Sequence, residues 1–160
     1  MAHSSAHVVG LISDTHGLLR PGVYDAFQGV ELILHAGDVG GADILEELSL
    51  IAPVKAVFGN TDPTDTPQLT QALELTIDRV TIHLSHGHEL GSPTPAKLAE
   101  RYAADVVVYG HTHRQLVTRL EGRLIVNPGA AGPKRFNLTP TVARLTIAGE
   151  TREVELVDIP

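Results

Sequence analysis

Side chains that can bind a metal ion follow five short apolar segments of the chain, each close to the point where the segment ends. These side chains are Asp14 and His16, Asp38, Asn60, His86, and the pair His111 and His113. Carboxylate, amide and imidazole groups are common ligands of divalent cations. In an open α/β sheet, binding sites form outside the carboxyl ends of the strands. If the segments are strands, seven donors meet at one edge, and the sequence predicts a site for more than one metal ion.

Each of these segments also has an ordinary interpretation. An Asp or Asn beside a glycine, as in GD at 37–38 and GN at 59–60, is typical of a turn. Histidines such as His111 and His113 are common in loops, although in an extended segment the two rings would lie on the same side. The ordinary interpretations are independent of one another, whereas a metal site explains all five segments with one cause.

The donor types indicate which metals would bind. The chain has no cysteine, so thiolate ligands are excluded. Imidazole, amide and carboxylate donors together suit Mn, Fe, Co, Zn or Ni, whereas Mg and Ca prefer shells made of oxygen alone. One carboxylate that bridges through both of its oxygens would hold two ions about 3.5–4 Å apart.

Strands and helices that alternate over the first sixty residues would position the first donors. Apolar segments at 7–12, 30–38 and 53–60 are typical of buried strands. The segments at 21–28 and 41–50 between them are predicted helices. This order predicts βαβ units and a parallel sheet that is covered on both faces.

The second half of the chain predicts the remaining strands. A loop at 61–68 precedes a β-hairpin around Asp78-Arg79, and a helix at 94–104 leads into a strand at 105–109. From there to the end the pattern is that of β-strands. No linker divides the chain, and 160 residues suit one domain over 1–160.

Composition excludes several classes of partner. The formal charge is −7 and the longest basic cluster is the pair Lys134-Arg135, so we expect no long nucleic acid as partner. No apolar run approaches the about 20 residues of a membrane span, and the start does not resemble a secretory signal. The absence of cysteine fits a cytoplasmic protein.

In their order along the chain, five motifs resemble those of the calcineurin-like metallophosphoesterases. The motifs are DTH at 14–16, GD at 37–38, GNTD at 59–62, HGH at 86–88 and GHTH at 110–113. The short chain, the GNTD form and NPG at 127–129 resemble the small YfcE-like phosphodiesterase branch, whose relatives include a retromer subunit. The resemblance spans essentially the whole chain. It implies a four-layer α/β/β/α sandwich of two mixed sheets flanked by helices.

The resemblance also implies a role for each donor. Asp14, His16, Asp38 and His113 would hold a first divalent metal, and Asp38, Asn60, His86 and His111 a second, with Asp38 shared. The implied function is that of a dinuclear, Mn²⁺-dependent phosphodiesterase. In such an enzyme a hydroxide that bridges the two metals attacks a small phosphodiester.

One position departs from many members of this family. They carry a histidine directly after the motif Asn60, where it is thought to protonate the leaving group, whereas this chain has Thr61. His88 and Asp62 are the candidates for that catalytic task, and support of the metal ligands is the alternative for both. We expect His35 to be a packed or supporting histidine. Asn127 is either a turn residue or a hydrogen-bonding residue near the site.

Three functional hypotheses follow from the sequence. The first is the phosphodiesterase or phosphatase with a small phosphoester substrate. The second is a scaffold protein that has lost turnover, as in the retromer relative, although a scaffold has no need of seven donors. A DNA-repair nuclease, the third, is disfavoured by the short chain and by the lack of a basic groove. The pattern is compatible with a homo-oligomer.

Overall fold

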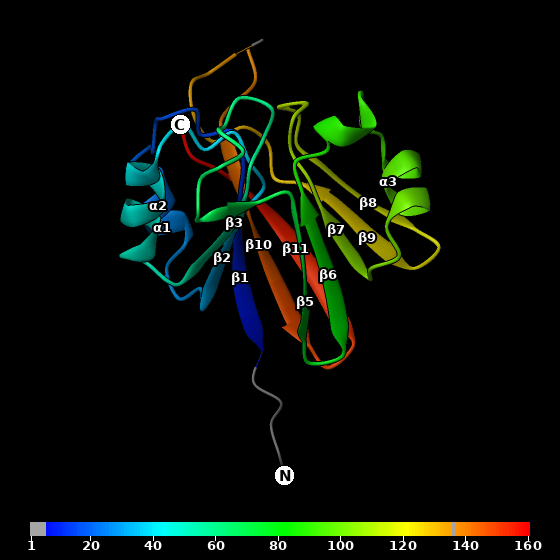
Figure 1. Ribbon diagram of the computed structural model, residues 1–160. Helices are drawn as coiled ribbons and strands as arrows, with labels where there is room; N and C mark the ends of the chain where they lie inside the picture. The colour runs from blue at the N-terminus through cyan, green and yellow to red at the C-terminus, as the bar shows by residue number, and fades with distance from the viewer. Residues whose placement is uncertain (1–5, 136) are drawn as a thin grey trace.

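The computed structural model describes residues 6–135 and 137–160, which form two packed β-sheets (Figure 1). The first sheet has six strands in the order β11-β10-β1-β2-β3-β4. Its strands are β1 (His7–Ile12), β2 (Leu32–His35), β3 (Val54–Val57), β4 (Leu69–Thr70), β10 (Thr141–Ala148) and β11 (Thr151–Asp158). Strands β1 to β4 are parallel, whereas β10 is antiparallel to both β1 and β11. This sheet is therefore mixed.

The second sheet has five strands in the order β5-β6-β7-β9-β8. Its strands are β5 (Ala72–Ile77), β6 (Val80–Ser85), β7 (Val106–Val108), β8 (Leu116–Leu120) and β9 (Arg123–Asn127). The central strands β6, β7 and β9 run parallel, and the edge strands β5 and β8 are antiparallel to their neighbours. The predicted hairpin around Asp78 is thus confirmed as β5 and β6.

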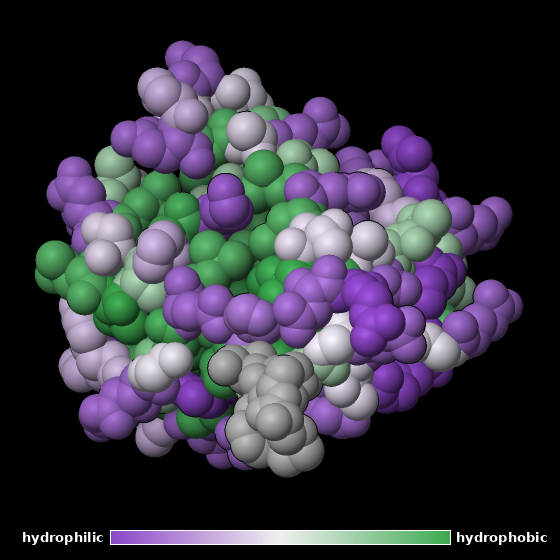
Figure 2. All heavy atoms as spheres, turned by 90° about the horizontal axis from the view of Figure 1, so that it is seen from below, coloured by the Kyte–Doolittle hydropathy of each residue, from purple (hydrophilic) through white to green (hydrophobic). Residues whose placement is uncertain are grey.

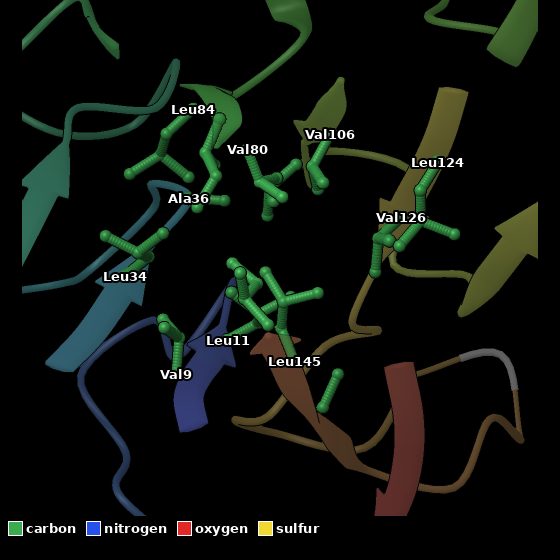
Figure 3. Close-up of a cluster of buried hydrophobic side chains, with 14 of the residues drawn as sticks. Val9, Leu11, Leu34, Ala36, Val80, Leu84, Val106, Leu124, Val126 and Leu145 are labelled. Atoms are coloured by element: carbon green, nitrogen blue, oxygen red, sulfur yellow. The ribbon is translucent and has the colours of Figure 1, made fainter. Parts of the chain in front are cut away.

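Helices cover the outer face of each sheet. Helices α1 (Gly22–Ala26) and α2 (Ala42–Ser49) pack on the six-stranded sheet, and α3 (Pro95–Arg101) packs on the five-stranded one (Figure 1). A core of Val, Leu, Ile and Ala side chains fills the space between the sheets (Figure 3). The expected four-layer α/β/β/α sandwich is confirmed. A short 3₁₀ turn, η1 (His88–Leu90), follows β6. None of the helices in the described ranges is long and apolar enough to cross a membrane.

Strand β1 shows how the sequence pattern builds these layers. Successive side chains of a strand point to opposite faces of its sheet. Val9 and Leu11 therefore enter the core between the sheets, whereas Ile12 packs with the helices. Gly10 lies on the helix side as well, where an added Cβ would come within 2.9 Å of the Phe27 ring. The absence of a side chain at Gly10 lets α1 pack closely on β1.

At the end of the sandwich where β1 begins, His7 lies between two carboxylates. Its Nδ1 is 2.9 Å from Glu31 Oε1 and its Nε2 is 3.1 Å from Asp78 Oδ1. Glu31 precedes β2 of one sheet and Asp78 lies in the β5–β6 turn of the other. His7 therefore links the two sheets at this end. Figure 2 looks at that end and shows hydrophilic residues next to a hydrophobic area of the surface.

We expect this link to make stability depend on pH. The hydrogen bond with Glu31 raises the pKa of His7 above 6.5, although desolvation opposes it. A raised pKa in the folded state means that the contribution is complete below about pH 6.5 and is lost as the pH rises through the folded pKa. His7→Gln should therefore lower the urea midpoint at about pH 5.5 and have little effect at about pH 9. An equal loss at both pH values would show that the ion pairs contribute nothing.

Candidate metal centre

The loops that carry the seven predicted donors lie at one end of the sandwich, beyond the carboxyl ends of strands from both sheets (Figure 1). In the six-stranded sheet they follow the parallel strands β1, β2 and β3. In the five-stranded sheet they follow β6 and β7, which are parallel as well. The sheet topology therefore brings the donor loops together at the carboxyl ends of the strands, as predicted. The donors range from fully buried Asp14 and His86 to exposed Asn60.

The backbone at the donors is unusual. Five of them have positive φ angles: Asp14 (54°), His16 (45°), Asp38 (55°), His111 (71°) and His113 (65°). Residues other than glycine rarely adopt this left-handed conformation, which costs about 1–3 kcal/mol per residue and persists mainly at functional sites. It also means that the segment from His111 to His113 is not extended. The two rings have different neighbours, since His111 lies against His86 and His113 lies against His16.

The Asp14 carboxylate is oriented by one of its oxygens and presents the other. Oδ2 accepts hydrogen bonds from the Ser13 hydroxyl (2.7 Å) and from the backbone N–H of His111 (3.2 Å). Oδ1 is buried and has no hydrogen-bond partner among the described residues. It lies 3.4 Å from His113 Nε2 and 3.6 Å from His16 Nε2. A buried anionic oxygen that faces two imidazole nitrogens is well suited to a cation.

The Asp38 carboxylate follows the same plan. Oδ1 accepts hydrogen bonds from the backbone N–H (2.9 Å) and the hydroxyl (2.7 Å) of Thr61. Oδ2 faces His86 Nε2 at 3.2 Å and His16 Nε2 at 3.6 Å. Burial raises the pKa of Asp38, but the hydrogen bonds from His86 and Thr61 outweigh it and hold the pKa well below its ordinary value. Thr61 therefore orients the Asp38 carboxylate through Oδ1, and a bridging role for Asp38 stays a prediction from the sequence.

The remaining donors gather around Asn60. Its Oδ1 lies 3.1 Å from His86 Nε2 and 3.2 Å from His111 Nδ1. The other ring nitrogen of His86 lies 2.8 Å from the carbonyl oxygen of Ala36, so Nδ1–H donates there and Nε2 is directed at the site. Metal-binding histidines commonly have such an arrangement. Burial lowers the pKa values of His111 and His113 and favours their neutral, metal-binding form.

The donors form two groups of possible metal ligands, which have Asp14 in common. One group contains Asp14, His16 and His113, and a second contains Asp14, Asp38 and His86, each with ligand atoms within 4.8 Å of one another. Asn60 and His111 extend the second group through their contacts with His86. Metal–ligand bonds of about 2.0–2.2 Å place neighbouring ligands at such separations. Oxygen and nitrogen donors of this kind fit divalent transition metals.

Asp62 joins two of the donor loops. Its carboxylate accepts hydrogen bonds from the backbone N–H groups of Val39 (3.0 Å), Gly40 (3.1 Å) and Gly59 (2.9 Å). These amides flank Asp38 on one loop and Asn60 on the other. Both carboxylate oxygens therefore accept hydrogen bonds from the backbone. Of the two roles considered for Asp62, the structure therefore favours support of the ligands over proton transfer.

His35 and His88 have contrasting surroundings. His35 is fully buried, and burial lowers its pKa to about 4. Its Nδ1 accepts the backbone N–H of Gly37 and its Nε2 contacts the Thr15 hydroxyl at 3.0 Å, which fits the predicted supporting role. His88 is partly exposed, and its ring centroid lies 5.4 Å from that of His86. It is therefore close enough to the donors to remain a candidate proton donor.

Asn127 fastens the loop that carries His111 and His113. The buried amide donates from Nδ2 to the carbonyl oxygen of Gly110 (3.2 Å) and to the Thr112 hydroxyl (3.0 Å). Its Oδ1 accepts the backbone N–H of Gly129 (2.9 Å). Of the two interpretations of Asn127, the structure supports hydrogen bonding near the site.

We expect Asn127→Asp to weaken metal binding by about 10–100-fold, the usual cost of losing a residue that orients ligands. Aspartate keeps the acceptor for Gly129 but loses both donors, so a carboxylate oxygen would face the Gly110 carbonyl. Calorimetric titration with Mn²⁺ measures the effect. Asn137→Asp, at an exposed position, makes the same change of charge and should leave the affinity unchanged. Equal affinities for the two variants would contradict the role of Asn127.

Sequence reasoning missed the groups that orient the two carboxylates. Ser13 and the His111 backbone act on Asp14, and Thr61 acts on Asp38. The only signal was proximity in sequence, since Ser13 precedes Asp14 and Thr61 follows Asn60. That signal is weak because serine and threonine commonly flank turns.

A four-layer sandwich with acidic and histidine donors at the strand ends of both sheets is a metallophosphoesterase fold. Residues 8–150 match the calcineurin-like phosphoesterase superfamily domain. The chain therefore belongs to the calcineurin-like phosphoesterase superfamily, as its five motifs indicate.

Relatives and solved structures agree with this family. The chain is 36% identical to a "Probable metallophosphoesterase" of Methanothermobacter thermautotrophicus, over 94% of this chain and 91% of the relative. Vps29 of Entamoeba histolytica, solved with zinc, superposes with a TM-score of 0.79 at 24% identity, covering 96% of this chain and 99% of that one. An archaeal phosphodiesterase superposes with a TM-score of 0.74 at 24% identity, covering 94% and 99%. Family membership supports a phosphoesterase hydrolase.

Proposed function

We propose that this protein is a phosphodiesterase that uses two divalent cations per chain, with Mn²⁺ preferred, to hydrolyse a small phosphodiester. The observation that carries the proposal is the shared plan of Asp14 and Asp38. In each carboxylate, one oxygen is fixed by two protein donors and the other faces imidazole nitrogens. A protein that needed only the fold would have no reason to keep the buried Asp14 Oδ1 without a hydrogen-bond partner among the described residues.

The proposed ligands divide as the resemblance implies. Asp14, His16, Asp38 and His113 hold one cation, and Asp38, Asn60, His86 and His111 hold the other. Divalent cations at such sites activate water and withdraw charge from a phosphoryl group. The separations of His16 and His86 from Asp38 Oδ2 support the shared role of this oxygen. Asn60, which is exposed, marks the side from which a substrate would approach.

The chain's own residues would provide orientation and a proton. Thr61 and Asp62 hold the Asp38 and Asn60 loops in register through their hydrogen bonds. The His88 ring, whose centroid lies 6.3 Å from that of His111, is the candidate to donate a proton to the leaving group. A small substrate is favoured because the formal charge of −7 opposes a long polyanion. A cytoplasmic location remains a prediction from the sequence.

The test is metal removal and reconstitution with two substrates. We expect protein dialysed against chelator to lose hydrolysis of bis(p-nitrophenyl) phosphate, and added Mn²⁺ to restore it with two ions bound per chain. p-Nitrophenyl phosphate in parallel distinguishes a diesterase from a monoesterase. Full activity with at most one ion bound would overturn the dinuclear proposal.

A scaffold function is the second candidate, and the Vps29 structures with the same fold support it. It predicts no turnover of either ester with any of Mn²⁺, Co²⁺, Ni²⁺ or Zn²⁺, although metal still binds. The reconstitution experiment therefore decides between the two candidates.

A further inference from the structure

The loop between β9 and β10 lies directly against the loop that carries Asp14. The backbone N–H of Ala131 donates to the Ser13 carbonyl oxygen (2.9 Å), and that of Gly132 donates to the Asp14 carbonyl oxygen (3.2 Å). A Cβ at Gly132 would lie 2.1 Å from the Thr15 carbonyl oxygen, so only glycine permits this approach. The β9–β10 loop is thus fixed to the backbone of the candidate metal centre.

Arg20 fixes the same loop from the other side. Its Nε donates to the Gly132 carbonyl oxygen (2.9 Å), in a partly buried contact between residues far apart in the sequence. Both backbone groups of Gly132 are therefore used, the N–H by Asp14 and the carbonyl by Arg20. Because Gly132 is held on two sides, the residues that follow it leave from a defined place beside the Asp14 backbone.

The residues that emerge there are cationic. Lys134 and Arg135 are both exposed, and within the described ranges neither forms an ion pair with a carboxylate. Two other exposed arginines do so, since Arg79 lies 4.0 Å from Glu150 and Arg119 lies 3.5 Å from Glu153.

We propose that Lys134 and Arg135 form an anion subsite beside the Asp14 loop of the metal centre, which binds a second phosphate group of the substrate. This inference rests on the proposed function. The reacting phosphodiester would be bound by the cations, so unpaired cations beside them are suited to another anionic group of the same molecule. A guanidinium can bind a phosphate monoester through two parallel hydrogen bonds, and an adjacent ammonium adds a third donor. The substrate class is then a phosphodiester that also carries a terminal phosphate.

The experiment compares two substrates that differ only in the second phosphate. They are the 5′-(p-nitrophenyl) ester of thymidine 5′-phosphate and the same ester with a 3′-phosphate. We expect Mn²⁺-loaded wild type to prefer the second substrate in kcat/KM by about tenfold or more, as one charge-assisted contact allows. The preference should fall toward one in Arg135→Ala and in Lys134→Ala with Arg135→Ala, and it should weaken as salt is raised.

Arg79→Ala is the matched control, because it removes one exposed guanidinium from the opposite end of the molecule and should keep the preference. Calorimetric binding of thymidine 3′,5′-bisphosphate and thymidine 5′-monophosphate tests the subsite without turnover. Preference for the bisphosphate with no hydrolysis of either ester would support the subsite and overturn the proposed function. Hydrolysis with no preference, or an equal loss for both esters in Arg135→Ala, would overturn the subsite.

Discussion

Replacing Asp38 by Asn should lower turnover of a phosphodiester by more than about 10²-fold, since losing a mere supporting residue already costs about 10–100-fold. The structure gives a reason for this loss of turnover in either orientation of the new amide. If its NH₂ group replaces Oδ1, it faces the N–H and hydroxyl donors of Thr61. If it replaces Oδ2, the charge between His16 and His86 is lost and a donor takes the place of an acceptor.

The measurement combines kcat with metal content. We expect Asp38→Asn to bind fewer than two Mn²⁺ ions, while its circular dichroism spectrum stays that of wild type, because the side chain lies outside the strands. Asp65→Asn, at an exposed position in the 61–68 loop, makes the same change of charge and should keep full activity. If Asp38→Asn stays within a few-fold of wild type, Asp38 is not the shared ligand.

Most strands could be predicted because each one is marked by an apolar or alternating pattern within its own segment of the sequence. The apolar segment at 7–12 is β1 to the residue, and the alternation around Asp78-Arg79 is the β5–β6 hairpin. Strand β4 was missed because two residues cannot show a period, and it forms only by pairing with β3. The first helix was predicted over 21–28 but spans Gly22–Ala26, and helix ends are set by backbone hydrogen bonding that composition does not show.

The positions of the donors could be predicted for the same local reason, since each directly follows an apolar strand. How the donors are oriented could not be predicted. Thr61 binds Asp38 across two loops, and the His111 N–H binds Asp14 from the other sheet. Such contacts join residues far apart in the sequence. The positive φ angles of Asp14 and His113 likewise depend on the surroundings, because the isolated residues disfavour them.

The second large effect that we expect is a strong dependence of the hydrolysis rate on the acidity of the leaving group. Thr61 stands where many family members have a histidine, and its hydroxyl donates to Asp38 Oδ1 at 2.7 Å. A hydroxyl committed to this bond, with a pKa far above neutral, cannot serve as a strong acid. We therefore expect aryl phosphodiesters with acidic phenols to react faster than alkyl esters. The difference in kcat should be about 10²–10⁴-fold, because general acid catalysis usually contributes a factor of this size. The logarithm of the rate should fall steeply as the leaving-group pKa rises.

Thr61→His tests this interpretation, but it makes two changes at once. It adds an imidazole and removes the hydroxyl that orients Asp38, whereas the backbone N–H contact of residue 61 is kept. Thr61→Val removes only the hydroxyl, so comparison of the two variants isolates the imidazole. We expect both to lose metal affinity to a similar extent, and only Thr61→His to show a shallower dependence on leaving-group pKa. A shallow slope already present in wild type, with chemistry rate-limiting, would mean that another group donates the proton. The partly exposed His88 would then be the residue to replace, because Asp62 is held by three backbone amides.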